Sequence, residues 1–227
     1  MIPIRDEIKT KRIPYVNYAL IAINIIVFMT MFVNPQKAEA IVMEHALIPA
    51  EVTQNFSLGV IKNFFTAMFM HAGWLHLVSN MLYLWIFGDN IEDRLGHLGY
   101  LLFYLGAGLF ASILHVVFNV NSVVPTLGAS GAIAGVLGAY LVFYPSSRVY
   151  TFIPFGFFMR LRPLPAVLVL GLWFVTQFFS GLGSMVSTAQ GGVAYWAHIG
   201  GFVFGLLIAL FLKGRVKEPV PAPPHWN

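Results

Sequence analysis

Two residues of the types that carry out hydrolysis lie inside apolar stretches of this sequence. Ser130 stands in the run Gly128–Gly131 at the start of one apolar segment, and His198 stands in Ala197–Gly201 near the start of another. A hydroxyl and an imidazole are the two groups that a minimal serine hydrolase needs. Polar side chains are costly at membrane depth unless they have partners or line a wet cavity. Ser130 is therefore a candidate nucleophile, and His198 is a candidate general base.

The composition of the chain indicates an integral membrane protein. Of its 227 residues, 58% are hydrophobic and only 10% are charged, so a soluble domain would lack its polar coat. The absence of cysteine excludes disulfides, thiolate metal sites and a cysteine nucleophile. The net charge of +4 does not indicate nucleic-acid binding, because the basic residues flank apolar segments and form no patch. We expect no cofactor and no metal.

Six stretches are candidates for transmembrane helices, which need about 20 mostly apolar residues each. They are Tyr15–Val33, Trp74–Ile91, Gly99–Phe118, Ser130–Tyr144, Leu164–Leu182 and Val193–Leu212. The fourth is short, and a helix that begins below the membrane surface leaves room above it for the water that hydrolysis needs. We therefore predict an all-α polytopic membrane protein, a bundle of six transmembrane helices with a short central fourth helix.

The distribution of basic residues predicts the orientation of these spans. Eleven of the thirteen Lys and Arg would lie on one side: Arg5, Lys9, Lys11, Arg12, Arg94, Arg148, Arg160, Arg162, Lys213, Arg215 and Lys217. Only Lys37 and Lys62 would lie on the other side. We expect a cytoplasmic segment at residues 1–14, a membrane domain at 15–212 and a cytoplasmic, disordered tail at 213–227. The lack of a presequence and the compact length suggest a bacterial cytoplasmic membrane.

This orientation places four polar residues at a similar depth. The second, fourth and sixth spans all run from outside to inside. His76 and Asn80 lie near the start of the second, Ser130 starts the fourth, and His198 lies a few residues into the sixth. All four then fall in the outer third of the membrane. Because hydropathy does not require that agreement, it is the strongest physical argument that they form one site.

Glycines at helical spacing predict how the fourth and sixth spans pack. One face of the fourth span carries Gly128, Gly131, Gly135 and Gly138. On the sixth span the face of His198 also carries Gly201 and Gly205. Small residues at this spacing let helix backbones approach closely in lipid. If the two faces meet, His198 lies beside Ser130.

His76 and Asn80 are candidates for stabilising an oxyanion. They are four residues apart on one helix face, and both can donate hydrogen bonds toward one point. The start of the fourth helix would add the free N–H of Ser130 and a favourable dipole. Each residue alone has a simpler structural explanation, as helix packing or as a buried histidine. At one depth and together, they favour a hydrolase.

Three segments resemble the motifs of the rhomboid family of intramembrane serine proteases. His71–Met81 fits H-x-x-x-x-H-x-x-x-N, Gly128–Gly131 fits G-x-S-G, and Ala197–Gly205 fits A-H-x-x-G-x-x-x-G. The resemblance extends over nearly the whole chain, from Ile13 through the sixth span. A further stretch, Gly88–Gly96, is similar to the family's segment at the inner end of the second span, where Glu92 is expected to cap or pair locally.

The resemblance implies a serine endopeptidase that cleaves transmembrane or membrane-proximal segments of membrane proteins. Ser130 and His198 would form a dyad without an acidic third member. His76 and Asn80 would donate to the oxyanion, and His71 would be a structural residue that hydrogen-bonds the first outer loop. The expected partners are single-span membrane protein substrates and the lipid bilayer.

The chain departs from the family's pattern at two places. Lys62 and Asn63 stand where many members have a Trp-Arg pair in the first outer loop. Ala134 stands where members commonly have an aromatic residue that packs on the catalytic histidine. The first departure affects the anchoring of the loop and the second affects the support of the His198 ring. Neither removes a reacting group.

The fifth span is a candidate entrance for the substrate. A transmembrane substrate must enter sideways from lipid and unwind, because a helix protects its own carbonyls. Leu164–Leu182 has bulky aromatics and no comparable glycine stripe, so we expect the most loosely packed wall there, with Trp173 and Phe178 as gate residues. The following glycines are a candidate lid: Gly181, Gly183, Gly191 and Gly192. The competing explanation is that these aromatics only face lipid.

Other functions are also compatible with parts of the pattern. An inactive relative could bind membrane helices for quality control, although it would need neither Ser130 nor His198. Three imidazoles, those of His71, His76 and His198, could hold zinc with an open position. That site would leave the serine unexplained. A channel or transporter is disfavoured because no span carries a second buried charge suited to a pathway.

Overall fold

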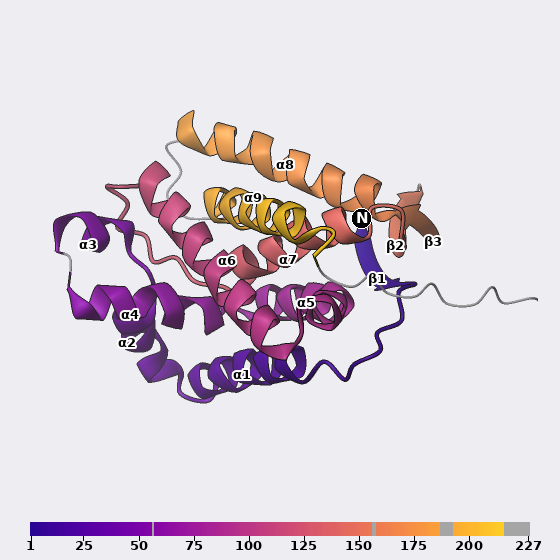
Figure 1. Cartoon of the computed structure of the whole chain (residues 1–227). Helices are drawn as coiled ribbons and strands as arrows, with labels where there is room; N and C mark the ends of the chain where they lie inside the picture. The colour runs from indigo at the N-terminus through magenta and orange to yellow at the C-terminus, as the bar shows by residue number, and fades with distance from the viewer. Residues whose placement is uncertain (56, 156–157, 187–192, 216–227) are drawn as a thin grey trace, which may run out of the picture.

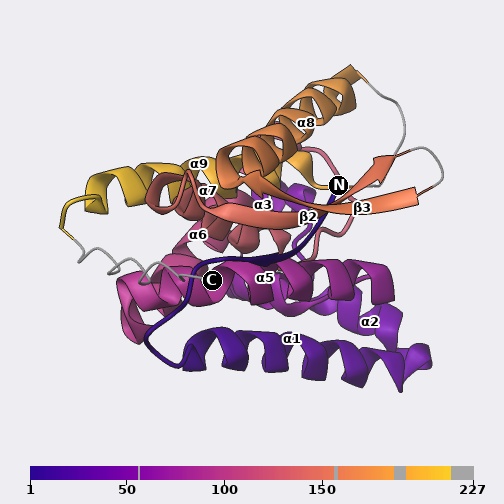
Figure 2. The same ribbon diagram turned by 90° about the vertical axis from the view of Figure 1, so that its right-hand side faces the viewer.

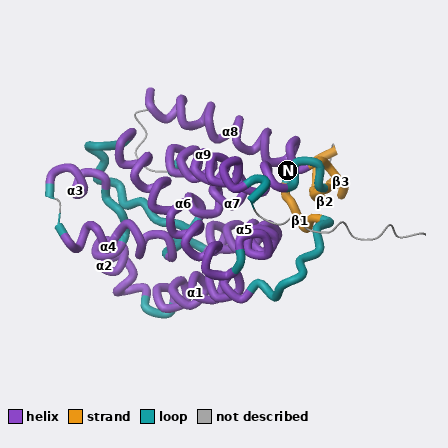
Figure 3. Tube along the Cα trace, viewed as in Figure 1, coloured by secondary structure: helices purple, strands orange, loops and turns teal. Residues whose placement is uncertain are grey.

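The computed structural model describes residues 1–55, 57–155, 158–186 and 193–215. Most of them are helical, and the helices form a bundle with strands along one side (Figures 1 and 3). The long helices of the bundle are α1 (Tyr15–Phe32), α5 (Trp74–Leu95), α6 (His97–Phe118), α7 (Ser130–Phe143), α8 (Ala166–Val186) and α9 (Tyr195–Leu212). Short helices connect α1 to α5, namely α2 (Pro35–His45), α3 (Pro49–Gln54), α4 (Leu58–Thr66) and a 3₁₀ turn, η1 (Ala67–Phe69).

A helix covers each of the six predicted spans, but the helices differ in their suitability for crossing a membrane. Four described helices, α1, α6, α8 and α9, are long and apolar enough. The apolar helix α7 has only 14 residues. Helix α5 has 22 residues, but its last two turns carry charged side chains: Asp89, Glu92, Asp93 and Arg94. The short fourth helix that the sequence predicts is therefore present as α7.

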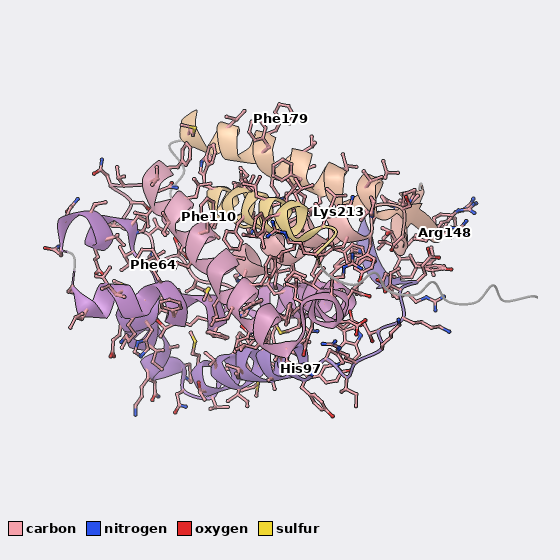
Figure 4. All side chains as sticks on the ribbon, in the orientation of Figure 1. Phe64, His97, Phe110, Arg148, Phe179 and Lys213 are labelled. Carbon is pink, nitrogen blue, oxygen red and sulfur yellow. The ribbon has the colours of Figure 1, made fainter. Side chains whose placement is uncertain are left out.

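Helix α7 lies at the centre of the bundle and α8 at its periphery. Nearly every residue of α7 is buried, because α5, α6 and α9 pack around it. Helix α8 is the least buried of the four spanning candidates, and both views show it at the outer edge of the bundle (Figures 1 and 2). Figure 4 shows Phe179 of α8 pointing away from the other helices, and this side chain is 66% exposed. The expectation that the fifth span is the most loosely packed wall agrees with this arrangement.

The all-α prediction is wrong in one respect, because the chain also forms a three-stranded antiparallel sheet. Its strands are β1 (Ile2–Asp6), β2 (Arg148–Phe155) and β3 (Phe158–Pro165), in the order β1-β2-β3. The β2–β3 hairpin joins α7 to α8, and the N-terminal segment adds β1 to its edge, with Asp6 opposite Val149. β-branched and aromatic residues alternate along β2, as in many strands. The predicted fourth and fifth spans leave residues 145–163 as a connection, and no strand is predicted there.

Asp6 attaches this sheet to α5 and α7. Its Oδ2 atom accepts hydrogen bonds from the hydroxyl of Tyr140 at 2.5 Å and from Nδ2 of Asn90 at 3.0 Å. The Tyr140 hydroxyl also lies 2.7 Å from Oγ of Ser147. Burial is the main cause that raises the pKa of Asp6 to about 6. The N-terminal strand is thereby held against one side of the bundle, between α8 and α5 in Figure 2.

Glu92 holds the start of α1. Its carboxylate accepts the backbone N–H groups of Val16 at 3.0 Å and Asn17 at 2.7 Å, which are free donors in the first turn of a helix. Its Oε1 atom also lies 2.5 Å from Nδ1 of His97, a residue that Figure 4 shows beside α1. Glu92 therefore pairs locally, with His97, as expected, but it also caps a helix distant in the sequence, α1.

Candidate active site

The site begins with the contact between the glycine faces of α7 and α9. A Cβ on Gly201 would lie 1.9 Å from the carbonyl oxygen of Gly131, and a Cβ on Gly205 would lie 1.9 Å from that of Gly135. A Cβ on Gly138 would lie 2.2 Å from the carbonyl oxygen of Phe202. No side chain fits at these distances, so the two backbones touch because the residues are glycines. The packing of α7 on α9 is the one that the glycine spacing predicts.

This packing brings Ser130 and His198 together. Ser130 is the first residue of α7, and His198 lies in the first turn of α9. Oγ of Ser130 and Nε2 of His198 are 2.7 Å apart, a normal hydrogen-bond distance. The histidine is buried, with 9% of its surface exposed.

Gly128 shapes the entry to the serine. Its φ of +135° belongs to a region that other residues rarely adopt, and its N–H donates to the carbonyl of Ala67 at 2.9 Å. A Cβ at this position would lie 2.8 Å from the ring of His76 and 3.6 Å from Oγ of Ser130. The absent side chain therefore keeps open the space between His76 and the serine.

His76 and Asn80 line the same cavity as the serine and histidine. The Nδ1 atom of His76 accepts the N–H of Ala72 at 3.4 Å, which leaves Nε2 as the donor of a neutral ring. Nδ2 of Asn80 is buried and has no hydrogen-bond partner among the described residues. A buried donor without a partner is costly and calls for a ligand or water. Both side chains can therefore donate toward a group in the cavity.

One cavity connects these residues. It has a volume of about 1200 Å³. The residues with candidate chemical roles that line it are Ser130, His198, His76 and Asn80. Its walls include Tyr83 of α5 and Trp173 of α8, so it lies between these two helices. The four residues that the sequence places at one depth thus line one cavity.

The side chain of His71 is buried. Its ring packs edge-on against that of His76, with centroids 5.0 Å apart and an angle of 69°. His71 therefore contacts the site through the His76 ring, and its hydrogen bond to the first outer loop stays a prediction.

The two candidate gate residues differ in their contacts. Trp173 lines the cavity, and its ring centroid lies 5.8 Å from that of His198. Phe178 is 40% exposed and meets Phe179 edge-on. Of the candidate lid, Gly181 and Gly183 belong to α8 rather than to a loop. Gly191 and Gly192 lie outside the described residues, as does the tail from residue 216 onward.

One neighbour of His198 was not identified from the sequence. Oε1 of Gln177 in α8 lies 2.8 Å from Nδ1 of the histidine. A glutamine belongs to no motif, and it stands alone in an apolar stretch. The available signal was that a polar residue within a membrane span needs a partner.

The two departures from the family's pattern have local compensations. Nζ of Lys62 lies 3.1 Å from Nδ1 of His45, and Oγ1 of Thr66 donates to the His45 carbonyl at 2.7 Å. These contacts tie α4 to the end of α2. Ala134 is fully buried. The ring that contacts His198 comes from α8, as Trp173.

The zinc alternative has no support in this geometry. In the described part of the chain, no three His, Cys, Asp or Glu side chains come together in a way that could hold a metal ion. Nε2 of His198, the nitrogen nearest the cavity, is already in contact with Ser130.

Comparison with known proteins gives a consistent set of relatives. The family model "Rhomboid domain" matches residues 58–215. The chain is 27% identical over 212 residues to Rhomboid protein 1, mitochondrial, of Saccharomyces cerevisiae, covering 88% of this chain and 54% of that protein. It is 31% identical over 201 residues to Rhomboid protease GluP of Bacillus subtilis, covering 88% and 35%. Rhomboid-like protein 11, chloroplastic, of Arabidopsis thaliana is 31% identical over 159 residues, with 66% and 52% covered.

The chain spans about half the length of these relatives or less. Their names place them in mitochondria and chloroplasts as well as in a bacterium, so they do not support the prediction of a bacterial cytoplasmic membrane. They do support an integral membrane protein, together with the four apolar helices. The domain match covers more than half of the chain and includes both Ser130 and His198. The chain belongs to the rhomboid family.

Proposed function

We propose that this protein is an intramembrane serine endopeptidase with Ser130 as nucleophile and His198 as general base. The observation that carries the proposal is the 2.7 Å contact between Oγ of Ser130 and Nε2 of His198, in a cavity between apolar helices. The relationship to a protein named as a rhomboid protease supports the same activity. The substrate would be a transmembrane or membrane-proximal segment of a membrane protein, single-span proteins being the simplest case.

The first half of the reaction forms an acyl-enzyme. Nε2 of His198 takes the hydroxyl proton while Oγ of Ser130 attacks the substrate carbonyl carbon. The carbonyl π electrons move to oxygen, which gives a tetrahedral oxyanion. When the intermediate collapses, the C–N bond breaks and the imidazolium gives its proton to the leaving amine.

The oxyanion is where His76 and Asn80 act. The unpartnered Nδ2 of Asn80 and Nε2 of His76 are donors that border the same cavity as Ser130. The backbone N–H of Ser130 at the start of α7 is a third donor with the helix dipole behind it. Donors that are already oriented stabilise the charge as it develops.

The second half of the reaction needs water. The cavity has room for water, and polar groups such as Asn119 and Thr126 line it. His198 removes a proton from the water, the resulting hydroxide attacks the ester carbonyl, and Ser130 leaves after taking that proton back. The carboxylate product is released and the starting state returns.

The membrane arrangement completes the proposal. Six helices, α1 and α5 to α9, would cross the membrane, with both ends of the chain cytoplasmic and the cavity toward the outer face. Residues 15–212 would be the protease domain. A substrate would enter the cavity between α5 and α8, which both contribute to its walls.

The test is cleavage of a single-span membrane protein by the purified chain in liposomes. Wild type should cleave it, whereas Ser130→Ala and His198→Ala should be inactive and keep the wild-type melting temperature. A fluorophosphonate probe should label Ser130 in wild type and fail in His198→Ala, because an unassisted hydroxyl is a poor nucleophile. Cleavage by well-folded Ser130→Ala would refute the assignment. A wild-type protein that binds the substrate but neither cleaves nor is labelled would identify an inactive, helix-binding relative.

A further inference from the structure

His198 is hydrogen-bonded at both of its ring nitrogens. Nε2 lies 2.7 Å from Oγ of Ser130, and Nδ1 lies 2.8 Å from Oε1 of Gln177. Ser130 belongs to α7 and Gln177 to α8, so the ring on α9 joins three helices. No carboxylate occupies the second position; an uncharged amide does.

With the amide oxygen of Gln177 facing Nδ1, the contact is a hydrogen bond in only one tautomer of the histidine. An amide oxygen accepts hydrogen bonds and cannot donate, so this contact requires a proton on Nδ1 of His198. The lone pair of the neutral ring is then on Nε2, which faces the hydroxyl of Ser130. Only this tautomer can take the serine's proton. The reversed amide would present its NH₂ group to Nδ1 and leave a proton on Nε2, where the ring could not act as a base.

Trp173 contacts the same ring from another direction. It precedes Gln177 by four residues, and residues at this spacing share a helix face. Its ring centroid lies 5.8 Å from that of His198, at 33° to it, and 6.1 Å from that of Phe202. One face of α8 thus presents an indole and an amide to the histidine. From α7, Ala134 offers only a methyl group.

We propose that Gln177 is a positioning residue that holds His198 in its Nδ1-protonated tautomer with Nε2 directed at Ser130. This rests on the proposed function, in which His198 is the base. The role corresponds to that of the third residue in Ser-His-Asp and Cys-His-Asn sites. An amide performs it without adding a second ionised group among apolar helices, where charge is costly.

The location of Gln177 couples substrate entry to catalysis. Helix α8 is the least buried spanning candidate and forms a wall of the cavity. If the substrate enters beside α8, as the proposed function has it, movement of α8 takes Gln177 and Trp173 away from the histidine together. The base is oriented again only when α8 returns. Hydrolysis is thereby confined to the closed state.

The experiment compares three α8 variants of the full chain in liposomes, each with a measured melting temperature. Gln177→Leu removes the acceptor at similar size, and Gln177→Glu keeps an acceptor and adds charge. Thr176→Val is the matched control, since Thr176 is exposed and bonds only within its own helix in the described structure. For each, kcat and KM for a single-span substrate are measured from pH 5 to 9.

Gln177→Leu should lower kcat by about 10- to 100-fold with little change in KM, the usual effect of removing a group that orients an imidazole. Gln177→Glu should recover at least tenfold of that loss. The acidic limb of its kcat/KM profile should move to higher pH, because the carboxylate favours the imidazolium. Thr176→Val should match wild type. A Gln177→Leu variant with wild-type kcat, or a loss that Gln177→Glu neither recovers nor shifts in pH, would overturn the proposal.

A second measurement does not depend on activity. NMR of ¹⁵N-histidine in the full chain, with the His198 signals identified by comparison with His198→Ala, reports the tautomer directly. Wild type should carry the proton on Nδ1, and Gln177→Leu should lose this preference. An unchanged tautomer in Gln177→Leu rejects the positioning role. If wild type neither cleaves nor reacts with fluorophosphonate, the proposed function fails, and the NMR result alone decides the role of Gln177.

Discussion

The Cα of Gly201 in α9 lies so close to Gly131 in α7 that a methyl group on it would be 1.9 Å from the Gly131 carbonyl oxygen. This contact sets the distance between the two helices that carry His198 and Ser130. Gly205 follows Gly201 by four positions, and Gly135 follows Gly131 by four. Gly205 and Gly135 therefore repeat the contact one helical turn further along. The separation of the two reactive groups is therefore a consequence of backbone packing.

Gly201→Ala should accordingly damage both stability and activity. The backbone carbonyl of Gly131 cannot move aside as a side chain could, so the helices must separate. Overpacking of this kind costs about 1–3 kcal/mol, and the Ser130–His198 contact should lengthen. We expect a lower melting temperature and slower fluorophosphonate labelling.

The matched control for this substitution is Gly171→Ala in α8. Nothing lies within 4 Å of a Cβ at Gly171. Alanine is the better helix former by about 1 kcal/mol, so this variant should be as stable as wild type or more so. Equal effects of the two substitutions would show that close packing of α7 on α9 is unimportant.

His76→Ala and Asn80→Ala should reduce turnover much more than substrate binding. Their donors act on charge that appears only in the transition state, and each is worth up to about 10²–10³ in rate where the oxyanion site is well formed. The measurement is kcat and KM for a single-span substrate. Wild-type turnover in both variants would reassign the pair to helix packing.

Sequence patterns were enough to bring the four candidate site residues together, whereas they missed parts of the fold around them. The depth of a residue and the spacing of glycines can both be read from a single span. These two features were enough to predict that Ser130, His198, His76 and Asn80 lie together, and the four residues line one cavity. Glu92 is different, because the N–H groups that it accepts belong to Val16 and Asn17, far away in the chain. No local pattern contains such a partnership.

The sheet and Gln177 were missed for related reasons. Strand β1 forms because β2, near residue 150, provides an edge for it to pair with. Ile2–Asp6 has only five residues, too few for a sequence pattern that would predict a strand. Gln177 acquires its role from the packing of α8 on α9. Both depend on tertiary neighbours, whereas the residues found from the sequence depend on repeats within one helix.

Asp6 should make stability depend on pH. Burial raises its pKa to about 6 from 3.8, so the folded state binds the proton more tightly than the unfolded state. The stability from this group is complete below about pH 4 and is lost as pH rises to about 6. Asp6→Asn can still accept a hydrogen bond from Tyr140 but lacks the charge. Its melting temperature should therefore depend less on pH over this range.

Thermal unfolding in detergent from pH 4 to 7 measures this effect. The difference in melting temperature between Asp6→Asn and wild type should increase in favour of the variant as pH rises. A constant difference across the range would show that the carboxyl of Asp6 titrates alike in both states.

The proposed entrance separates the two aromatic residues that the sequence grouped together. Phe178 contacts Phe179 near the outer part of α8 and is absent from the cavity lining, whereas Trp173 lines the cavity and contacts His198. Phe178 is 40% exposed, so more of its ring is covered than that of Phe179, and Phe178→Val should loosen α8 and speed cleavage of a membrane-embedded substrate several-fold. It should do little for a water-soluble substrate, which does not enter from lipid. Trp173→Val should lower kcat for both substrates, because it removes support from the base.

Phe179→Val is the control for Phe178→Val, because its side chain points away from the bundle (Figure 4) and is 66% exposed. It changes the same type of residue on the same helix at a position where less of the ring is covered. Rates with both substrates, measured beside the melting temperature, separate a gate from a scaffold. If Phe178→Val leaves both rates unchanged, or lowers both together with the melting temperature, lateral opening at α8 is excluded as the step that admits the substrate. A gain confined to the embedded substrate, and absent in Phe179→Val, means that the movement of α8 limits entry and that the helix carrying Gln177 must close again before His198 can act.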